Sequence, residues 1–598
     1  MRLGVAFAFV VVLWLSVFRG ALTPWWLLAP AVSFLALVAM HLRVREKRRR
    51  AIEGVAFYED GLARVEDRWM GRRRGSDRFE DDSHLYAADL NIFGAGSLFE
   101  LLSTARTRAG EETLAGWLTT PASQAEIQAR QEAVEELRGR IDLREDLAVL
   151  GAGNRSPTEP ERLVRWTTMP SIFPGRHLKI IFPLLAAVVF ASLLAVWLSD
   201  TDRAWLAFYG SVSAAGLVGL FYRTRVRQTL SAAQDHAGEI DLLSQVLARL
   251  EREQFRSPKL VAMRASLETA GSAPSSQAAR FARLVDLANW RRTELPLTLI
   301  ILYKAGLLVL PFTFALWLTQ VARAMDAWRS CYGPAVGRWA AAVGEFEALC
   351  ALAGYAYEHP ADPFPEVVDS GPFFHGMALR HPLIAQAASV PNTVRLGPDS
   401  RLLVVSGSNM SGKSTLLRTV GVNVVLALAG APVRAERLRL STLDLGATIR
   451  IQDSLQAGTS RFYAEIQRIR QIMDQTDGPD PVLFLLDEIL QGTNSDDRAQ
   501  GAEAIIRSLI RRGAIGLVTT HDLALAKVAD ALAPLASNVH FADRLEDGRL
   551  VFDYRMRPGI VRRSNALELM RAVGLDVDGD HRQVAVPKPS ALVTSRTD

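Results

Sequence analysis

The sequence predicts a mixed α/β protein, in which a helical N-terminal part with two apolar hairpins precedes a domain built on a parallel sheet. Hydrophobic residues make up 49% of the 598-residue chain and are concentrated in paired runs in its first part. Amphipathic helical patterns lie between the pairs, and from about residue 366 short β-branched runs alternate with helical stretches. The mean hydropathy of +0.10 is high for a purely soluble protein and low for one embedded wholly in lipid.

Composition and charge exclude several classes of protein. A chain with 49% hydrophobic and 22% charged residues is neither collagen-like nor disordered. The net charge of +5 is compatible with a nearby anionic surface but is too small to prove a nucleic-acid partner. Cys331 and Cys350 are the only cysteines, and they have neither metal-site spacing nor the density of a disulfide scaffold. We expect two reduced thiols in a cytosolic domain.

Residues 1–50 predict the first hairpin. Apolar runs at 3–18 and 21–40 are separated by Arg19 and Gly20, and a membrane-spanning helix needs about 20 apolar residues. The second run is followed by basic residues, which place that end in the cytoplasm by the positive-inside rule (Arg43, Arg45, Lys47, Arg48, Arg49 and Arg50). A secretory signal is the alternative for the first run, but no small-x-small cleavage site follows it.

Residues 176–226 predict the second hairpin. Apolar runs at 180–198 and 204–222 are joined by a short acidic loop at 199–203. The outer flanks are basic, so they are also expected in the cytoplasm (Arg176, His177, Lys179, Arg223, Arg225 and Arg227). The sequence thus predicts a multi-pass protein of the inner or plasma membrane, in contact with membrane lipid.

The polar segments that flank the second hairpin have helical patterns. Residues 51–175 contain apolar residues at near-helical spacing (Ile127, Val134 and Leu137). Residues 227–365 are predicted to form a long, lever-like helical segment. An amphipathic helix is expected over 223–290, broken near the Gly-Ser-Ala-Pro-Ser-Ser run at 271–276.

Residues 366–576 predict the sheet domain. Short β-branched or leucine-rich runs at 402–405, 482–486 and 515–518 alternate with helical stretches, as in a largely buried parallel sheet. Residues 577–598 are expected to form a flexible tail.

The most specific motif is Gly407-Ser408-Asn409-Met410-Ser411-Gly412-Lys413-Ser414, which fits the phosphate-loop pattern G-x-x-x-x-G-K-[ST]. It follows a predicted strand and opens a helix that continues from Thr415. The glycines let the backbone curl, so that its N–H groups and the helix N-terminus face the phosphates. Lys413 would reach the β and γ oxygens, and Ser414 would ligate Mg²⁺. The loop from Gly407 to Thr415 therefore predicts ATP binding by a P-loop NTPase.

Two acidic residues follow the next buried strand. Asp487 is expected to hold Mg²⁺ together with Ser414, while Glu488 polarises the water that attacks the γ-phosphate. His521 follows a third strand, at the edge where ligands of α/β sheets collect, and is interpreted as a γ-phosphate sensor. Glu488 and His521 are thus the predicted catalytic residues of a Mg²⁺-dependent ATP hydrolase.

A third apolar stretch, 295–318, contains Lys304 and Pro311. One further membrane crossing would place the nucleotide site outside the cell, where there is no ATP. We therefore interpret this stretch as a buried helix.

Several motifs together resemble the ATPase core of MutS mismatch-repair proteins. They are the loop from Gly407 to Thr415, Gly458-Thr459-Ser460-Arg461-Phe462, the run from Leu485 to Asn494, and Thr520-His521. No LSGGQ-like run of transporter-type ABC cassettes is present. Weaker similarity extends over roughly 84–140 and 330–575. The resemblance implies an ABC-type, MutS-like homodimer in which two subunits pair head to tail, with Gly458 and Ser460 of one subunit facing the nucleotide bound by Lys413 of the other.

The chain also departs from that family. A membrane hairpin stands where mismatch-recognising members have a reading domain with a Phe-x-Glu wedge, and Phe364-x-Glu366 matches those letters only by coincidence. The clamp that the family inserts into its long helices is not expected here, because the second hairpin stands near its place, and no nuclease-like domain is expected after residue 576. The ATP chemistry is therefore expected to carry over, whereas mismatch recognition is not.

Two functions from different classes remain open. The first is a membrane-anchored MutS-like ATPase coupled to DNA binding or mismatch repair, with basic runs such as 72–74 and 291–292 meeting DNA phosphates. The alternative is a membrane mechanical or transporter-like ATPase without DNA specificity. A scaffold that uses ATP only as a switch is disfavoured by the presence of Glu488 and His521.

Overall fold

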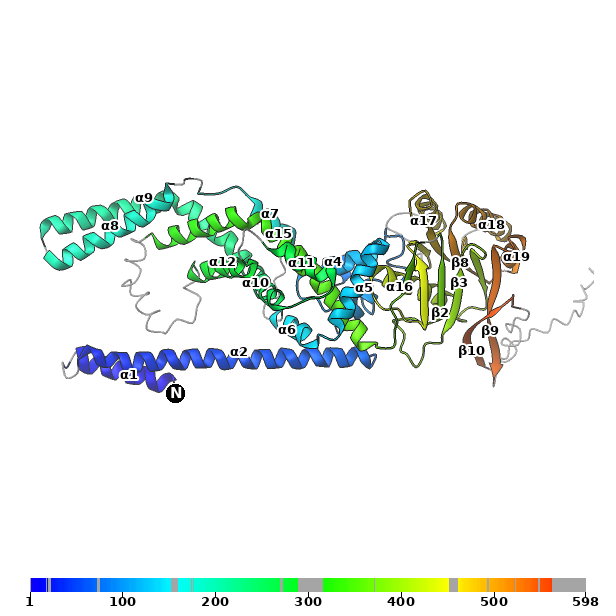
Figure 1. The fold of residues 1–598 in the computed structure, drawn as a ribbon, viewed down its shortest axis with the longest axis horizontal. Coiled ribbons are helices and arrows are strands. Elements are labelled where there is room, and N and C mark those ends of the chain that lie inside the picture. The colour runs from blue at the N-terminus through cyan, green and yellow to red at the C-terminus, as the bar shows by residue number, and fades with distance from the viewer. Residues whose placement is uncertain are drawn as a thin grey trace, which may run out of the picture. The chain divides into compact units, whose positions relative to one another are not determined.

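The computed structural model describes most of the chain. The described residues are 2–17, 19, 23–72, 76–151, 160–173, 175, 177–199, 201–268, 273–288, 316–369, 371–450, 461–491, 494–521, 523–546 and 549–561. The chain divides into a helical unit, Met1–Asp369 with Val422–Arg434, and a sheet unit, Ser370–Gly421 with Ala435–Asp598. The predicted mixed α/β protein with a helical N-terminal part is confirmed (Figure 1).

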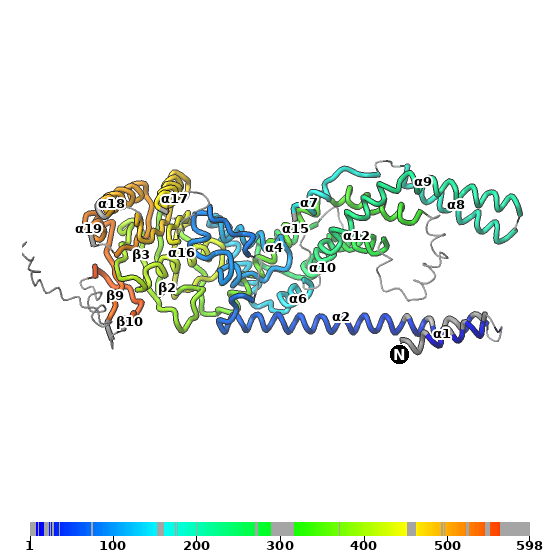
Figure 2. The backbone as a smooth tube through the Cα atoms, turned by 180° about the vertical axis from the view of Figure 1, so that it is seen from behind, coloured from blue at the N-terminus to red at the C-terminus, as the bar shows by residue number. Residues whose placement is uncertain are grey.

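The helical unit begins with two helices that pack against each other, α1 (Arg2–Val17) and α2 (Leu28–Val65), joined through a 3₁₀ turn at Pro24–Leu27. Figure 2 shows α2 as a long continuous helix. It continues beyond the predicted end of the first hairpin at residue 50, because good helix formers such as Glu, Lys, Arg and Ala follow the apolar run. A buried ion pair between Arg64 and Glu358, with an N–O distance of 2.6 Å, fastens the end of α2.

The second pair of apolar runs forms an antiparallel hairpin of α8 (Leu178–Ser199) and α9 (Asp202–Asp235), which lie side by side in Figures 1 and 2. The hydroxyl of Thr201 accepts a bond from the Ala204 N–H and caps α9. Ser192 and Ser211 form a buried hydrogen bond of 2.9 Å between the two helices. In the described part of the chain, α8 and α9 are the two helices long and apolar enough to cross a membrane; α1 holds a shorter apolar stretch, Phe7–Ser16.

Large apolar side chains of this hairpin point outward. Trp197 is 81% exposed and Leu206 is 76% exposed, values unusual for such residues on a soluble helix pair. Others behave in the same way on α8 (Ile180, Leu184, Val188, Phe190, Leu194 and Leu198) and on α9 (Tyr209, Leu217, Leu220 and Phe221). The base of the hairpin, in contrast, packs into an apolar cluster with Phe173, Leu316 and Ala322.

A buried polar network fastens the segment before α8 to α15 (Trp317–Glu358). The carboxylate of Asp326 accepts bonds from the Ser171 hydroxyl and from the Phe173 N–H, at 2.5 and 3.0 Å. Arg329 donates to Asp326 at 2.8 Å and to the carbonyls of Trp166 and Pro170. Both charges are almost fully buried, so each depends on the other for compensation.

The other helices among the described residues of this unit are α3 (Leu98–Leu102), α4 (Arg108–Thr119), α5 (Gln124–Arg138), α6 (Ile141–Gly151), α7 (Pro160–Thr168), α10 (Ala237–Arg252), α11 (Pro258–Leu267) and α12 (Pro274–Ala288). Short strand β1 is Glu366–Val368, and a 3₁₀ turn spans Asp77–Phe79. Helices α4, α5, α7 and α12 pack against α15. Ile127, Val134 and Leu137 of α5 are fully buried, which confirms the amphipathic pattern.

The prediction for residues 223–290 was wrong in one respect. The chain breaks not only near 271–276 but also at His236 and over 253–257, which separates α9, α10 and α11. Ser257 precedes Pro258, and proline favours the first turn of a new helix because it lacks the N–H that a helix interior needs. Most of the third apolar stretch, 295–315, lies outside the described residues, so its interpretation stays a prediction. Cys331 and Cys350 are free thiols, as expected.

The sheet unit contains two sheets. The smaller includes the antiparallel strands β2 (Phe374–Leu379), β3 (Asn392–Leu396) and β5 (Arg437–Ser441). The larger has the order β10-β9-β4-β8-β7-β6, and all of its neighbouring strands are parallel except β9 and β10. Its strands are β4 (Leu402–Ser406), β6 (Asp444–Thr448), β7 (Val482–Asp487), β8 (Ile515–Thr520), β9 (Ala536–Glu546) and β10 (Arg549–Pro558).

The helices that follow these strands are α16 (Lys413–Ala429), α17 (Arg461–Gln475), α18 (Ser495–Arg511) and α19 (Leu523–Ala531). β4 and β8 are buried along their whole length, and β7 is buried up to Asp487. The three strand-like runs expected at 402–405, 482–486 and 515–518 are therefore present. Central strands that are buried on both faces have continuous apolar sequences, so these three strands could be predicted from the sequence.

Candidate functional site

The candidate site lies where three adjacent parallel strands end. β8 stands between β4 and β7, with Ser406 opposite Thr520 and Asp487 opposite Thr519. Because parallel strands bring their carboxyl ends to one edge, the segments after β4, β7 and β8 meet there. These segments contain the predicted residues Lys413, Glu488 and His521.

The loop after β4 has a backbone that ordinary side chains would obstruct. Gly407 and Gly412 have φ angles of 154° and 102°. A Cβ at Gly407 would lie 2.8 Å from the Ser411 hydroxyl and 3.2 Å from the Phe541 carbonyl oxygen. The hydroxyls of Ser408 and Ser411 are buried and have no hydrogen-bond partner among the described residues. The loop is therefore a tight cradle with donors left over for a ligand.

The Lys413 ammonium is bound within this cradle. The side chain is only 4% exposed, and its Nζ donates to the carbonyls of Gly407 and Ser408 at 2.9 Å each. Nζ also lies 3.4 Å from Oε1 of Glu488. Lys413 thus occupies the position from which it can exchange carbonyl and carboxylate partners for a phosphate. Ser414 and Thr415 follow in the first turn of α16, and Ser414 is half-buried.

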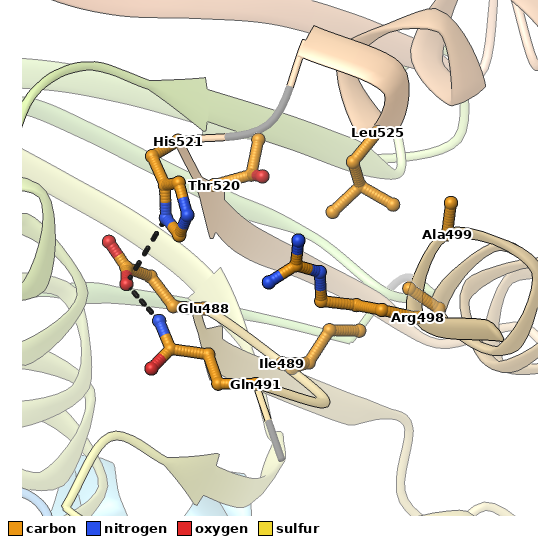
Figure 3. Close-up of a pocket in the computed structure, with 9 residues that line it drawn as sticks. Glu488, Ile489, Gln491, Arg498, Ala499, Thr520, His521 and Leu525 are labelled. Atoms are coloured by element: carbon orange, nitrogen blue, oxygen red, sulfur yellow. Dashed lines mark hydrogen bonds and ion pairs between the residues drawn. The ribbon is translucent and has the colours of Figure 1, made fainter. Parts of the chain in front are cut away.

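Glu488 is held from several directions at the end of β7. Its backbone adopts φ of 48°, and its N–H donates to the Thr519 hydroxyl at 3.0 Å. Oε2 lies 3.4 Å from Nδ1 of His521 and accepts a bond from the Gln491 amide (Figure 3). The neighbouring carboxylate of Asp487 accepts a bond from the same Thr519 hydroxyl. One hydroxyl of β8 therefore binds both the Asp487 carboxylate at the end of β7 and the backbone N–H of Glu488, which follows it.

A small pocket adjoins these groups. Figure 3 shows Glu488 and Gln491 on one side, His521 and Thr520 on another, and Arg498 of α18 extending between them. Its wall is completed by apolar and small residues (Ile489, Ala499, Ala502 and Leu525). His521 is 48% exposed in its side chain, so the imidazole is accessible at the mouth of the pocket.

Tyr554 of β10 lies against the glycine-rich loop. Its ring edge would be 3.1 Å from a Cβ at Gly412, and the residue is 44% exposed with φ of 54°. The strand has a bulge here, and the side chain of Asn392 bonds to both the Tyr554 carbonyl and the Met556 N–H, at 2.9 and 2.7 Å. Asn392 thus binds the backbone of the bulge that carries this aromatic ring.

Sequence reasoning missed several of these groups. Thr519 and Tyr554 were not predicted, nor were Gln491 and Arg498. The adjacent Thr519-Thr520-His521 run was a usable signal for Thr519, whereas the contact of Tyr554 arises from distant strands. The predicted in-trans residues Gly458 and Ser460 lie outside the described residues, as do the side chains of 492–493.

No group of three or more His, Cys, Asp or Glu residues suited to a metal occurs among the described residues. The predicted Mg²⁺ ligands are instead one hydroxyl, Ser414, and one carboxylate, Asp487. This small donor set fits a cation that keeps several waters and binds through substrate phosphates.

Comparisons with known proteins assign this part of the chain. Residues 403–578 match the model of MutS domain V. The DNA mismatch repair protein MutS 2 of Halobacterium salinarum is 35% identical over 245 residues, which is 40% of this chain and 28% of that protein. The DNA mismatch repair protein MutS of Myxococcus xanthus is 28% identical over 565 residues, covering 85% of this chain and 60% of that protein. The endonuclease MutS2 of Thermus thermophilus is 33% identical over 203 residues, 33% of this chain and 25% of its own.

The chain spans between a quarter and three fifths of the length of these relatives. The match to domain V includes the glycine-rich loop, Asp487, Glu488 and His521, and therefore covers the whole edge at which the three strands end. The longer similarity to the Myxococcus xanthus protein extends beyond the sheet unit into the helical part. The chain therefore contains a MutS domain V region and is similar to MutS proteins over most of its length.

Proposed function

We propose that this protein is a membrane-anchored ATPase that binds ATP with Mg²⁺ at the carboxyl edge of its six-stranded sheet and hydrolyses it. The observation that carries the proposal is the convergence of Lys413, Glu488 and His521 beside a glycine-rich loop with unpaired hydroxyls. Supporting it, the matched domain is shared with DNA mismatch repair and endonuclease relatives.

The residues of the site have distinct roles in this proposal. The loop N–H groups and the N-terminus of α16 hold the phosphates, and Lys413 leaves the Gly407 and Ser408 carbonyls to bind β and γ oxygens. Mg²⁺, bound by Ser414 and Asp487, would neutralise phosphate charge in the transition state. Glu488 accepts a hydrogen bond from the attacking water, and the bond from its backbone N–H to the Thr519 hydroxyl holds the backbone that carries the carboxylate.

His521 is proposed to contact the γ-phosphate. Its imidazole is tied to Glu488, at 3.4 Å, and is exposed at the pocket mouth. In the absence of a γ-phosphate, the His521 imidazole holds the Glu488 carboxylate. When the γ-phosphate is present, the imidazole donates a hydrogen bond to a phosphate oxygen instead. This exchange would make the position of Glu488 sensitive to the nucleotide.

The active unit is proposed to be a head-to-tail homodimer. The resemblance of Gly458-Thr459-Ser460 to the family's signature element implies that Ser460 completes the partner's site. Ser460 directly precedes α17 in the sequence, and a serine hydroxyl together with a helix N-terminus would offer donors suited to a γ-phosphate. Each dimer would then contain two composite sites.

The hairpin of α8 and α9 supports attachment to a membrane. Its outward side chains are large and apolar, its length is sufficient, and its outer flanks are basic. We propose an inner or plasma membrane location with two hairpins and the nucleotide site in the cytoplasm. The first hairpin rests on the apolar pattern of residues 1–50 alone.

We favour coupling of ATP hydrolysis to DNA binding, because these relatives are named as DNA mismatch repair proteins. The exposed apolar hairpin favours the alternative, a membrane mechanical or transporter-like ATPase. The test is the ATPase rate of the full chain in lipid nanodiscs, without DNA, with paired duplex and with mismatched duplex. Stimulation by DNA supports the first function, and a greater effect of mismatched DNA would add mismatch repair. An unchanged rate at low salt supports the alternative.

A further inference from the structure

The turn that carries Glu488 has an unusual backbone. Both Glu488 and Leu490 have positive φ angles, 48° and 60°, although neither is glycine. Side chains with a Cβ rarely adopt this left-handed region, so other contacts must hold the turn. Ile489 and Leu490 are buried, at 3% and 5% exposure, which anchors the turn on its apolar side.

The polar side of the turn is anchored by a carboxylate from a different element. Oε1 of Glu465, on α17, accepts a hydrogen bond of 2.7 Å from the Leu490 N–H. Glu465 is only 5% exposed. A buried carboxylate is costly unless its acceptors are used, so its placement against a backbone N–H is a specific contact.

The location of Glu465 connects two predicted parts of the site. It lies on the first turns of α17, five residues after Ser460 in the sequence. Its hydrogen-bond partner is two residues after Glu488, whose carboxylate is also held by Gln491 of the same turn. One side chain thus joins the helix that follows the signature element to the turn that carries the predicted base.

We propose that Glu465 is a positioning residue for hydrolysis. It holds the Glu488 turn in its left-handed conformation and couples the position of this turn to the position of α17. This inference rests on the proposed ATPase function. It does not place Glu465 in contact with substrate. Without the acceptor, the Leu490 N–H loses its bond, the turn relaxes toward ordinary backbone angles, and the Glu488 carboxylate leaves the line to the attacking water.

The variants Glu465→Met and Glu465→Gln separate shape from hydrogen bonding. Met has a similar length but no oxygen, whereas Gln keeps one amide oxygen able to accept from Leu490. The matched control is Glu503→Met on α18, because among the described residues the Glu503 carboxylate bonds to Arg507 of its own helix and its side chain is 42% exposed. All variants are measured as full-length protein in nanodiscs.

The first readout is the ATPase kcat together with the Kd of a fluorescent ATP analogue. We expect Glu465→Met to lower kcat at least tenfold while Kd stays within twofold, and Glu465→Gln to remain within threefold of the parent. Glu503→Met should match the parent. Parental kcat in Glu465→Met, or a loss in Glu465→Gln equal to that in Glu465→Met, would overturn the inference. A rise of Kd in step with the fall of kcat would also overturn it, since that indicates loss of the whole site.

Hydrogen exchange of a peptide covering 488–491 supplies a readout that does not depend on turnover. The Leu490 amide should be protected in the parent and in Glu465→Gln, and should exchange faster in Glu465→Met. An unprotected amide in the parent would show that the bond does not form. If the parent itself hydrolyses no ATP, the proposed function fails first, and the positioning role fails with it.

Discussion

The hydroxyl of Thr519 offers a sharp test of how the site is organised. Thr519 is fully buried on β8, donates to the Asp487 carboxylate, and accepts from the Glu488 N–H at 3.0 Å. Replacing it by Val keeps the branched shape and removes both bonds. A hydrogen bond to a charged group contributes about 1.5–3 kcal/mol and a neutral one about 1 kcal/mol.

Part of that energy is retained, because the Glu488 N–H also lies 3.3 Å from the Thr519 carbonyl. The net loss should therefore be about 2–3 kcal/mol. If it is expressed wholly in the transition state, kcat falls about 30- to 160-fold, since each 1.36 kcal/mol is a factor of ten.

The assay compares steady-state ATPase rates and ATP-analogue binding for Thr519→Val and Thr519→Ser. Thr519→Ser retains the hydroxyl and should keep most of the parental kcat, whereas Thr519→Val should bind nucleotide and turn over slowly. A Thr519→Val rate within twofold of the parent would refute the claim that turnover depends on the bonds of this hydroxyl to the Asp487 carboxylate and the Glu488 N–H.

Further predictions concern stability, nucleotide binding, dimerisation and topology. Burial raises the pKa of Glu347 to about 7 despite a bond from the Thr107 hydroxyl, so its protonated form is favoured in the folded state; stability should fall as pH rises from about 4.5 through 7, and Glu347→Gln should flatten this dependence in thermal melts. Tyr554→Ala should raise KM for ATP about fivefold or more with little change in kcat, if the ring stacks on the base, and Tyr554→Phe should not. Mixing Ser460→Arg with Lys413→Ala subunits should recover part of the activity that each lacks, because one composite site in each heterodimer is intact; a protein that hydrolyses ATP as a monomer in every nucleotide state contradicts this. Cysteine labelling should place the 199–203 loop outside and residues near 50, 175 and 225 inside, and labelling of residue 330 from the outer face would contradict the four-helix topology.

The sequence was most informative where one local pattern determines the structure. The strands β4, β7 and β8 are continuous apolar runs, and the glycine-rich loop follows directly from residues that need special backbone angles. The register between neighbouring strands could not be predicted from the sequence in the same way. That Thr519 stands opposite Asp487 depends on the pairing of β7 with β8, which no local spacing contains.

Long-range contacts explain the other differences. Tyr554 reaches Gly412 from a strand more than a hundred residues away, and Glu465 meets Leu490 through packing of α17 beside β7. The break before α11 follows from Pro258, which favours the first turn of a new helix, whereas the break at His236 has no side-chain cap and is not encoded in the amphipathic pattern. Local propensity therefore predicted the elements, while tertiary pairing determined the side chains that complete the site.

The measurement that tests the central claim most directly compares Lys413→Ala with Glu488→Gln for binding and turnover of ATP with Mg²⁺. Lys413 belongs to the cradle, so its loss should weaken binding of an ATP analogue strongly. Glu488→Gln leaves the cradle intact, and should bind the analogue within threefold of the parent while turnover falls about a hundredfold or more. Hydrolysis by Glu488→Gln at the parental rate would contradict the role assigned to this carboxylate and, with it, the account of the site.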